Sequence, residues 1–269
     1  MNARSLPDSL PTLAAGAHLP DEGEACVMEY VALLAGEDWT DSPRCTHPLL
    51  AFAARRTNDR ISDANRSLLV PLIGRLFGTE PRGSIADQEH VIARMRIASA
   101  RSTIDLLAPD FRPQVNAWLD IAEKWCDEPN RDGAAEAMSL AQARIAPQNF
   151  DHHSQDLVGL DEAHRAFHDE AVGAAAYICQ LADDAEGEGG SFRVAQAYAS
   201  VAELLAHRAA AQGACVYVCG PGAGSDVRMV RNLNALIDEH DLWTGHEPRE
   251  ITKRELAALA SQVAARSVA

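Results

Sequence analysis

The chain has 269 residues, of which 47% are hydrophobic and 23% charged, and it carries a formal net charge of −15. These values are typical of one or two globular domains with a buried core, and they exclude a disordered or collagen-like chain. No apolar run approaches the roughly 18–20 residues needed to span a bilayer, which excludes a transmembrane protein. The acidic charge, without any basic cluster, argues against binding to nucleic acid or to an anionic membrane surface.

The first 23 residues contain three prolines and no periodic apolar pattern, so we expect residues 1–23 to form a loose leader. This stretch lacks a sustained apolar core followed by a cleavage site, which predicts a cytoplasmic protein rather than a secreted one. The six cysteines of such a protein are expected to be reduced, with several of them packed in the core.

Helical periodicity dominates the rest of the chain. Alanine, the best helix former, occurs 49 times, whereas aromatic residues make up only 5%. Together these features predict an all-α fold, a multi-helix bundle of about nine to eleven helices. The apolar positions place helices at residues 24–34, 46–57, 62–77, 84–107, from 113 onward, 133–146, 159–183, 192–212, 225–240 and from 252 onward.

Local signals mark where these helices begin and end. Gly36 suits a left-handed helix end, and Pro71 predicts a kink inside the helix at 62–77. Polar side chains are expected to cap the helix starts, namely Thr46, Ser84 with Asp87, Ser225 or Asp226, and Thr252 with Glu255.

A polar stretch near the middle of the chain predicts a boundary between two helical modules. We expect a helical module over residues 24–147, a linker at 148–158 and an alanine-rich helical module over 159–269.

The first group of candidate metal ligands lies in the first of these modules. Thiolate, imidazole and carboxylate are the ligands that zinc uses, and five such side chains lie close in sequence: Cys26, Glu29, Asp41, Cys45 and His47. The tight Cys-x2–4-Cys spacing of a zinc knuckle is missing. The alternative is structural, with Cys26 in the core, Glu29 or Asp41 holding the loop, and His47 at a helix start.

The same region carries a recurring motif. It combines a Cys-x-Met-Glu helix, a Leu-x-Gly-Glu turn, an Asp-x-Pro-x-Cys loop and an Asn-Asp pair. The matching residues are Cys26, Met28, Glu29, Leu34, Gly36, Glu37, Asp41, Pro43, Cys45, Asn58 and Asp59. Over about residues 24–78, and more loosely to 146, the chain resembles a family of uncharacterised actinomycete and phage proteins. The resemblance implies a cytoplasmic helical protein and no particular activity.

A second group of candidate ligands is Asp161, His164 and His168, which share one face of the helix expected at 159–183. Arg165 occupies the position where a zinc protease places its catalytic glutamate, so that class is excluded. A solvated helix face is the alternative, and approach of His240 would favour a metal site there.

No intact catalytic motif appears elsewhere. The Asp-His-His tripeptide at 151–153 lacks the strand and upstream motifs of a phosphoesterase, and the glycine-rich stretch at 219–226 lacks the lysine of a Walker loop. We therefore lean away from an enzyme and expect a helical protein with a regulatory or assembly role. It would act through a protein partner or through self-association as a homo-oligomer. The alternative is a metal-dependent enzyme or metal sensor that binds zinc or another divalent metal, with Glu29 as general base; no other cofactor is predicted.

Overall fold

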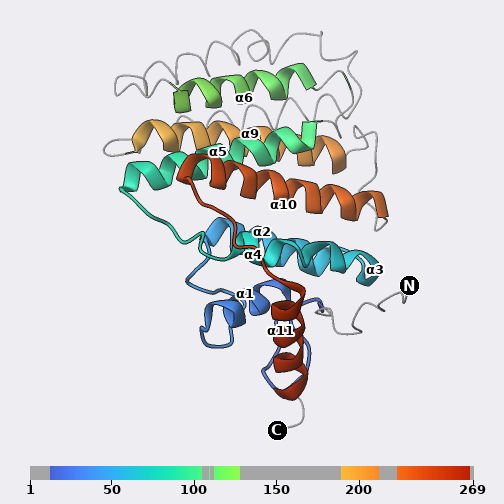
Figure 1. Ribbon diagram of the computed structural model, residues 1–269. Coiled ribbons are helices and arrows are strands. Elements are labelled where there is room, and N and C mark those ends of the chain that lie inside the picture. The colour runs from blue at the N-terminus through green and yellow to red at the C-terminus, as the bar shows by residue number, and fades with distance from the viewer. Residues whose placement is uncertain (1–12, 105–108, 110–111, 128–188, 212–222, 267–269) are drawn as a thin grey trace, which may run out of the picture. The chain divides into compact units, whose positions relative to one another are not determined.

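The computed structural model describes residues 13–104, 109, 112–127, 189–211 and 223–266, and in these ranges it confirms the all-α fold (Figure 1). They contain nine α-helices and one 3-10 turn, and β-pairing there is limited to an isolated bridge between Leu13 and Ala25. None of the helices described is long and apolar enough to cross a membrane. The helices expected at 133–146 and 159–183 and the linker expected at 148–158 lie outside the described residues.

The helices are α1 (Val27–Ala35), α2 (Pro48–Arg60), α3 (Asp63–Arg66), the 3-10 turn η1 (Ser67–Leu69), α4 (Leu72–Leu76), α5 (Ile85–Ile104), α6 (Arg112–Asp127), α9 (Gly190–Ala211), α10 (Ala223–Thr244) and α11 (Lys253–Arg266). They divide into a terminal unit, Met1–Pro81 with Gly220–Ala269, and a central unit, Arg82–Cys219. The last two helices therefore group with the first four, although more than a hundred residues separate them along the chain.

Several helix ends follow the predicted local signals. Gly36 ends α1 in the left-handed conformation, with φ 69°. The two predicted capping boxes are present. The Ser84 hydroxyl accepts a hydrogen bond from the Asp87 N–H, and the Asp87 carboxylate accepts one from the Ser84 N–H. Thr252 and Glu255 form the same pair of hydrogen bonds.

Two of the predicted caps are wrong. His47, not Thr46, is the N-cap of α2, because the Thr46 hydroxyl donates to the Leu76 carbonyl oxygen instead. Asp226 lies inside α10, and its carboxylate accepts hydrogen bonds from Ser62 and Asn65, so it supports the start of α3 rather than its own helix.

The single kinked helix expected over 62–77 is also wrong. The chain forms α3, the tight turn η1 and α4 in succession, with Pro71 immediately before α4. Proline has no N–H to donate and its ring crowds the preceding turn, so a continuous helix is broken at that position.

In the described part of the central unit, α9 packs along both α5 and α6. Small side chains fill much of its core, including Ala93, Ala100, Ala122, Ala195, Ala197, Ala199 and Ala202. Trp118 and Tyr198, whose ring centroids lie 5.4 Å apart, fill the space between α6 and α9. The alanine-rich composition thus serves close helix packing.

In the terminal unit, α10 packs against α2, α3 and α4, while α11 contacts α1. Residues 245–252, here called the strap, join α10 to α11. The strap begins at Gly245, whose φ of 67° turns the chain out of α10. It then lies along α4, where the Arg249 N–H donates to the Gly74 carbonyl oxygen at 3.2 Å.

Candidate metal centre

Cys26 and Glu29, two of the candidate ligands, lie together at the start of α1. The buried Glu29 carboxylate accepts hydrogen bonds from the Cys26 N–H at 2.7 Å, from the His18 N–H at 2.7 Å and from the His18 ring at 3.0 Å. Burial, and then the Glu29 charge, raises the pKa of the Cys26 thiol to about 12, which keeps it protonated. A protonated thiol beside a saturated carboxylate is a poor metal ligand.

The other three candidates in this region have separate structural contacts. The Asp41 carboxylate lies 3.7 Å from the Arg55 guanidinium, and the Cys45 thiol lies 3.8 Å from the Thr46 hydroxyl. The His47 ring accepts a hydrogen bond at Nδ1 from the Leu49 N–H at 3.2 Å, which places its proton on Nε2. Of the structural alternative, the buried Cys26 and His47 at the start of α2 match these contacts, whereas the loop that leads to Cys45 is held by Glu37 rather than by Glu29 or Asp41.

The other polar residues of the family-like motif also make structural contacts. The Asn58 amide donates to the Ala14 carbonyl oxygen at 2.7 Å, and the Asp59 carboxylate accepts from the Gly16 N–H at 2.8 Å. Glu37 accepts from the backbone N–H groups of the loop that ends at Cys45. These polar residues hold the irregular segments on either side of α1, so the motif specifies the fold of this region.

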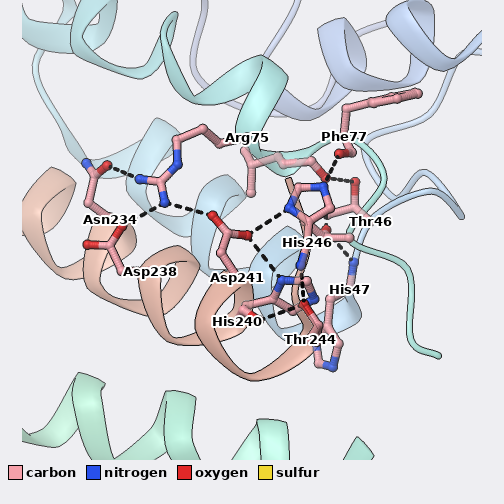
Figure 2. Close-up of polar contacts among 12 residues, drawn as sticks. Thr46, His47, Arg75, Phe77, Asn234, Asp238, His240, Asp241, Thr244 and His246 are labelled. Carbon is pink, nitrogen blue, oxygen red and sulfur yellow. Dashed lines mark hydrogen bonds and ion pairs between the residues drawn. The ribbon is translucent and has the colours of Figure 1, made fainter. Parts of the chain in front are cut away.

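The second group of candidates, Asp161, His164 and His168, lies outside the described residues. Among the residues that the structure describes, one group of three or more potential ligands has all its ligand atoms within 4.8 Å of one another: His240, Asp241 and His246. His240 and Asp241 are on the last two turns of α10, and His246 is the second residue of the strap (Figure 2).

The Asp241 carboxylate is the centre of this group. Its Oδ1 lies 2.8 Å from His246 Nδ1 and 3.4 Å from His240 Nδ1. The side chains of His240, His246 and Asp241 are 2%, 10% and 14% exposed, so the group is shielded without being sealed. The rings of His47 and His246 both meet the His240 ring edge to face, with centroids 5.8 and 5.7 Å away.

The outward faces of these side chains are already held by other groups. Arg75, on α4, donates to Asp241 Oδ2 at 2.9 Å and also to Asp238 at 2.7 Å and Asn234 at 3.0 Å. His246 Nε2 lies 3.0 Å from the Phe77 carbonyl oxygen. These contacts, drawn in Figure 2, fix the carboxylate and the ring so that Oδ1 and Nδ1 face each other.

The electrostatics of the group favour a cation. Burial works to raise the pKa of Asp241, but hydrogen bonds from His240, Arg75 and His246 outweigh it and hold the pKa below its usual range. The carboxylate is therefore ionised at neutral pH. Asp238 and Asp241 together carry one more charge than Arg75 balances, so these three side chains have a net charge of about −1.

Sequence reasoning missed this group as a site, although His240 was considered as an added ligand. The pattern His-Asp-x4-His has no helical spacing, because Gly245 ends the helix before His246. The sequence does place His240 and His246 on either side of Gly245, a residue suited to end a helix. Whether the two histidine rings meet depends, however, on the path of the strap.

Comparison of the chain with protein-family models, curated proteins and solved structures gives no match. The resemblance to actinomycete and phage proteins therefore stays a prediction, and the geometry of the site carries the functional argument.

Proposed function

We propose that this protein is a helical metal sensor that binds one divalent cation of the zinc class through His240, Asp241 and His246. One observation carries the proposal: three ligand atoms lie within 4.8 Å of one another while Arg75 and the Phe77 carbonyl oxygen hold the opposite faces of two of the ligands. Ligand residues of zinc sites characteristically have such outer hydrogen bonds, which orient the ring and fix its tautomer.

The donor set and its spacing favour zinc over magnesium or calcium. Two imidazoles and one carboxylate suit a borderline-soft ion, whereas the hard cations prefer all-oxygen sites. Ligand atoms about 2.0–2.1 Å from a tetrahedral ion are about 3.3 Å from each other. The distance from His240 Nδ1 to Asp241 Oδ1, 3.4 Å, already matches, and the distance from His246 Nδ1, 2.8 Å, needs to open by a fraction of an ångström.

His246 can serve as a ligand through Nδ1. With its proton on Nε2, a metal-bound ring would keep the hydrogen bond to the Phe77 carbonyl oxygen and direct the Nδ1 lone pair at a cation beside Asp241 Oδ1. A bound cation there would take the place of the proton that joins the two atoms.

A sensor is favoured over an enzyme because of where the ligands lie. His240 and Asp241 are on α10 and His246 is on the strap, so an ion at this site would cross-link two segments of the terminal unit. Occupancy then changes the stability of a segment, which is the response that a metal sensor requires.

The first test is elemental analysis of untagged protein that has been purified without chelator. The metal is then removed with a chelator, and the metal-free protein is titrated with zinc in a calorimeter. We expect one zinc per chain and a loss of at least tenfold in affinity for Asp241→Asn. Asp238→Asn is the matched control, because Asp238 lies on the same helix and binds the same arginine without belonging to the ligand set. Equal affinities for the two variants would refute the assignment.

A further pair of variants separates this site from the one considered in the sequence. His246→Ala should abolish the tight site, and His164→Ala with His168→Ala should leave it intact. The reverse result would place the metal on the helix expected at 159–183 and refute the site at α10.

The end of α10 favours a second candidate function, binding to a basic protein partner. Leu242 and Trp243, directly after the ligands, are 70% and 42% exposed. Asp238, with a side chain 66% exposed, and Glu239 precede them and would complement positive charge. A net charge of −15 makes copies of the chain repel each other, which disfavours self-association.

The partner proposal is tested by light scattering and by pull-down from the native extract. We expect a monomer that captures a basic protein, with capture lost in Leu242→Ser. A salt-independent dimer that this substitution disrupts would contradict the proposal and favour self-association instead.

A further inference from the structure

The strap is held to α4 and to Phe77, the residue that follows α4, by contacts that are independent of His240 and Asp241. The Arg249 N–H donates to the Gly74 carbonyl oxygen, and the Arg249 guanidinium lies over the Phe77 ring, 5.2 Å from its centroid. His246 adds the contact between its ring and the Phe77 carbonyl oxygen. Detachment of the strap would break all three contacts together.

Gly74 is essential to this close approach. A Cβ atom added there would lie 2.1 Å from the Arg249 carbonyl oxygen and 2.9 Å from the Ile251 side chain. The nearest of these atoms belongs to backbone, so relief requires the strap to move away from α4. The strap therefore docks on a surface that only glycine provides.

The contacts continue from the strap into α11. Arg249 forms an ion pair with Glu255 at 2.9 Å, and Glu255 is the capping-box residue that binds Thr252 at the end of the strap. Farther along α11, Leu259 and Val263 are 5% and 2% exposed, so this helix has a buried face. The strap thus holds the first turn of α11, and the buried face of this helix packs against α1.

We propose that metal binding at the α10 site locks the strap and α11 onto the terminal unit, and that their release is the response to metal loss. This inference rests on the proposed metal site. The ion binds the docked strap more tightly than the detached one, because detachment removes His246, one of its three ligands, and a ligand shifts an equilibrium only through such a difference in affinity.

The size of the effect follows from linkage. If the ion binds only the docked state, free zinc at 100 times its dissociation constant lowers the opening equilibrium of the strap about 100-fold. Coupling is reciprocal, so a substitution that favours opening must weaken zinc binding even when all three ligands remain.

Hydrogen–deuterium exchange of the full chain, with and without zinc, tests the inference. We expect amides of the strap and α11 to exchange up to about 100-fold more slowly with zinc, while those of α5 and α6 in the central unit stay unchanged. Gly74→Ala should speed exchange of residues 245–266 without zinc and weaken zinc binding, although it leaves every ligand in place.

Arg249→Gln repeats the test without adding any atom to the packed surface of α4. It removes only the contacts of the guanidinium with Phe77 and Glu255. It should act in the same direction as Gly74→Ala. Arg254→Gln is its charge-matched control, because Arg254 is exposed on α11, and it should change neither exchange nor affinity.

The outcomes separate the two proposals. Zinc binding with unchanged exchange in α11, or undiminished affinity in Arg249→Gln despite faster exchange, overturns the inference and leaves the metal site standing. Absence of zinc binding to the wild-type chain overturns the metal site and the inference with it.

Discussion

Glu29 offers a direct test of whether the motif around α1 is structural. Its side chain is 1% exposed, and three donors converge on its carboxylate: the Cys26 N–H, the His18 N–H and the His18 ring. Glu29→Gln keeps the shape but turns one oxygen into a donor. Because the two backbone N–H groups approach different oxygens, the amide leaves at least one of them facing another donor.

The expected cost is about 3 kcal/mol. An unsatisfied buried N–H costs about 1–3 kcal/mol, and the remaining hydrogen bonds lose the charge that made them worth about 1.5–3 kcal/mol each. With a urea slope of about 2 kcal/mol per molar, the unfolding midpoint of the terminal unit should fall by about 1.5 M. Circular dichroism during urea titration measures this shift.

Glu24→Gln is the control, since the Glu24 side chain is 65% exposed and lies 3.7 Å from the same His18 ring. It should change the stability by less than about 0.5 kcal/mol. Similar midpoints for the two variants would refute the structural role. Loss of bound metal in Glu29→Gln, with an unchanged midpoint, would instead identify Glu29 as a ligand.

Three further predictions concern stability. Burial, and then His240, lowers the pKa of His47 from 6.5 to about 4. As the pH falls, His47 in the unfolded chain therefore takes up its proton before His47 in the folded chain does. The metal-free protein should lose roughly 3 kcal/mol of stability as the pH falls from 6.5 to about 4. His47→Asn keeps a cap and should flatten this dependence in urea titrations at several pH values. Asp226→Ala should cost about 1 kcal/mol by removing the acceptor for Ser62 at the start of α3, and Asp226→Asn should cost less, as thermal unfolding would show. Ala195→Leu should overpack the core of the central unit and cost about 1–3 kcal/mol, measured by urea unfolding; an unchanged midpoint would contradict the close packing of α9.

The features that were predicted correctly depend on short stretches of sequence. Gly36 ends α1, and the capping boxes at Ser84 and Thr252 start α5 and α11, because each signal needs only residues within one turn of the helix. The broken helix at Pro71 was harder to predict. The local rule gives a kink or a break, and packing around α3 and α4 decides between them.

The errors share a physical cause. Thr46 and Asp226 have the right chemistry for caps, but each side chain binds a backbone or side-chain group from a distant part of the chain. Side-chain hydrogen bonds of this kind compete with local capping, and the sequence pattern does not show which of the two is formed.

The sequence by itself determined the all-α class and, in the described ranges, most helix boundaries to within a turn, since these follow from periodicity, helix propensity and local capping signals. Only the tertiary structure decided which ionisable side chains meet. Arg75 reaches Asp241 across 166 residues of chain, and His246 reaches Asp241 because Gly245 turns the strap and Gly74 lets it lie against α4. The ligands of this site come from α10 and the strap, and both pack against α4. Packing between elements sets the distances between these side chains, so the spacing of the ligand residues along the sequence does not reveal the site.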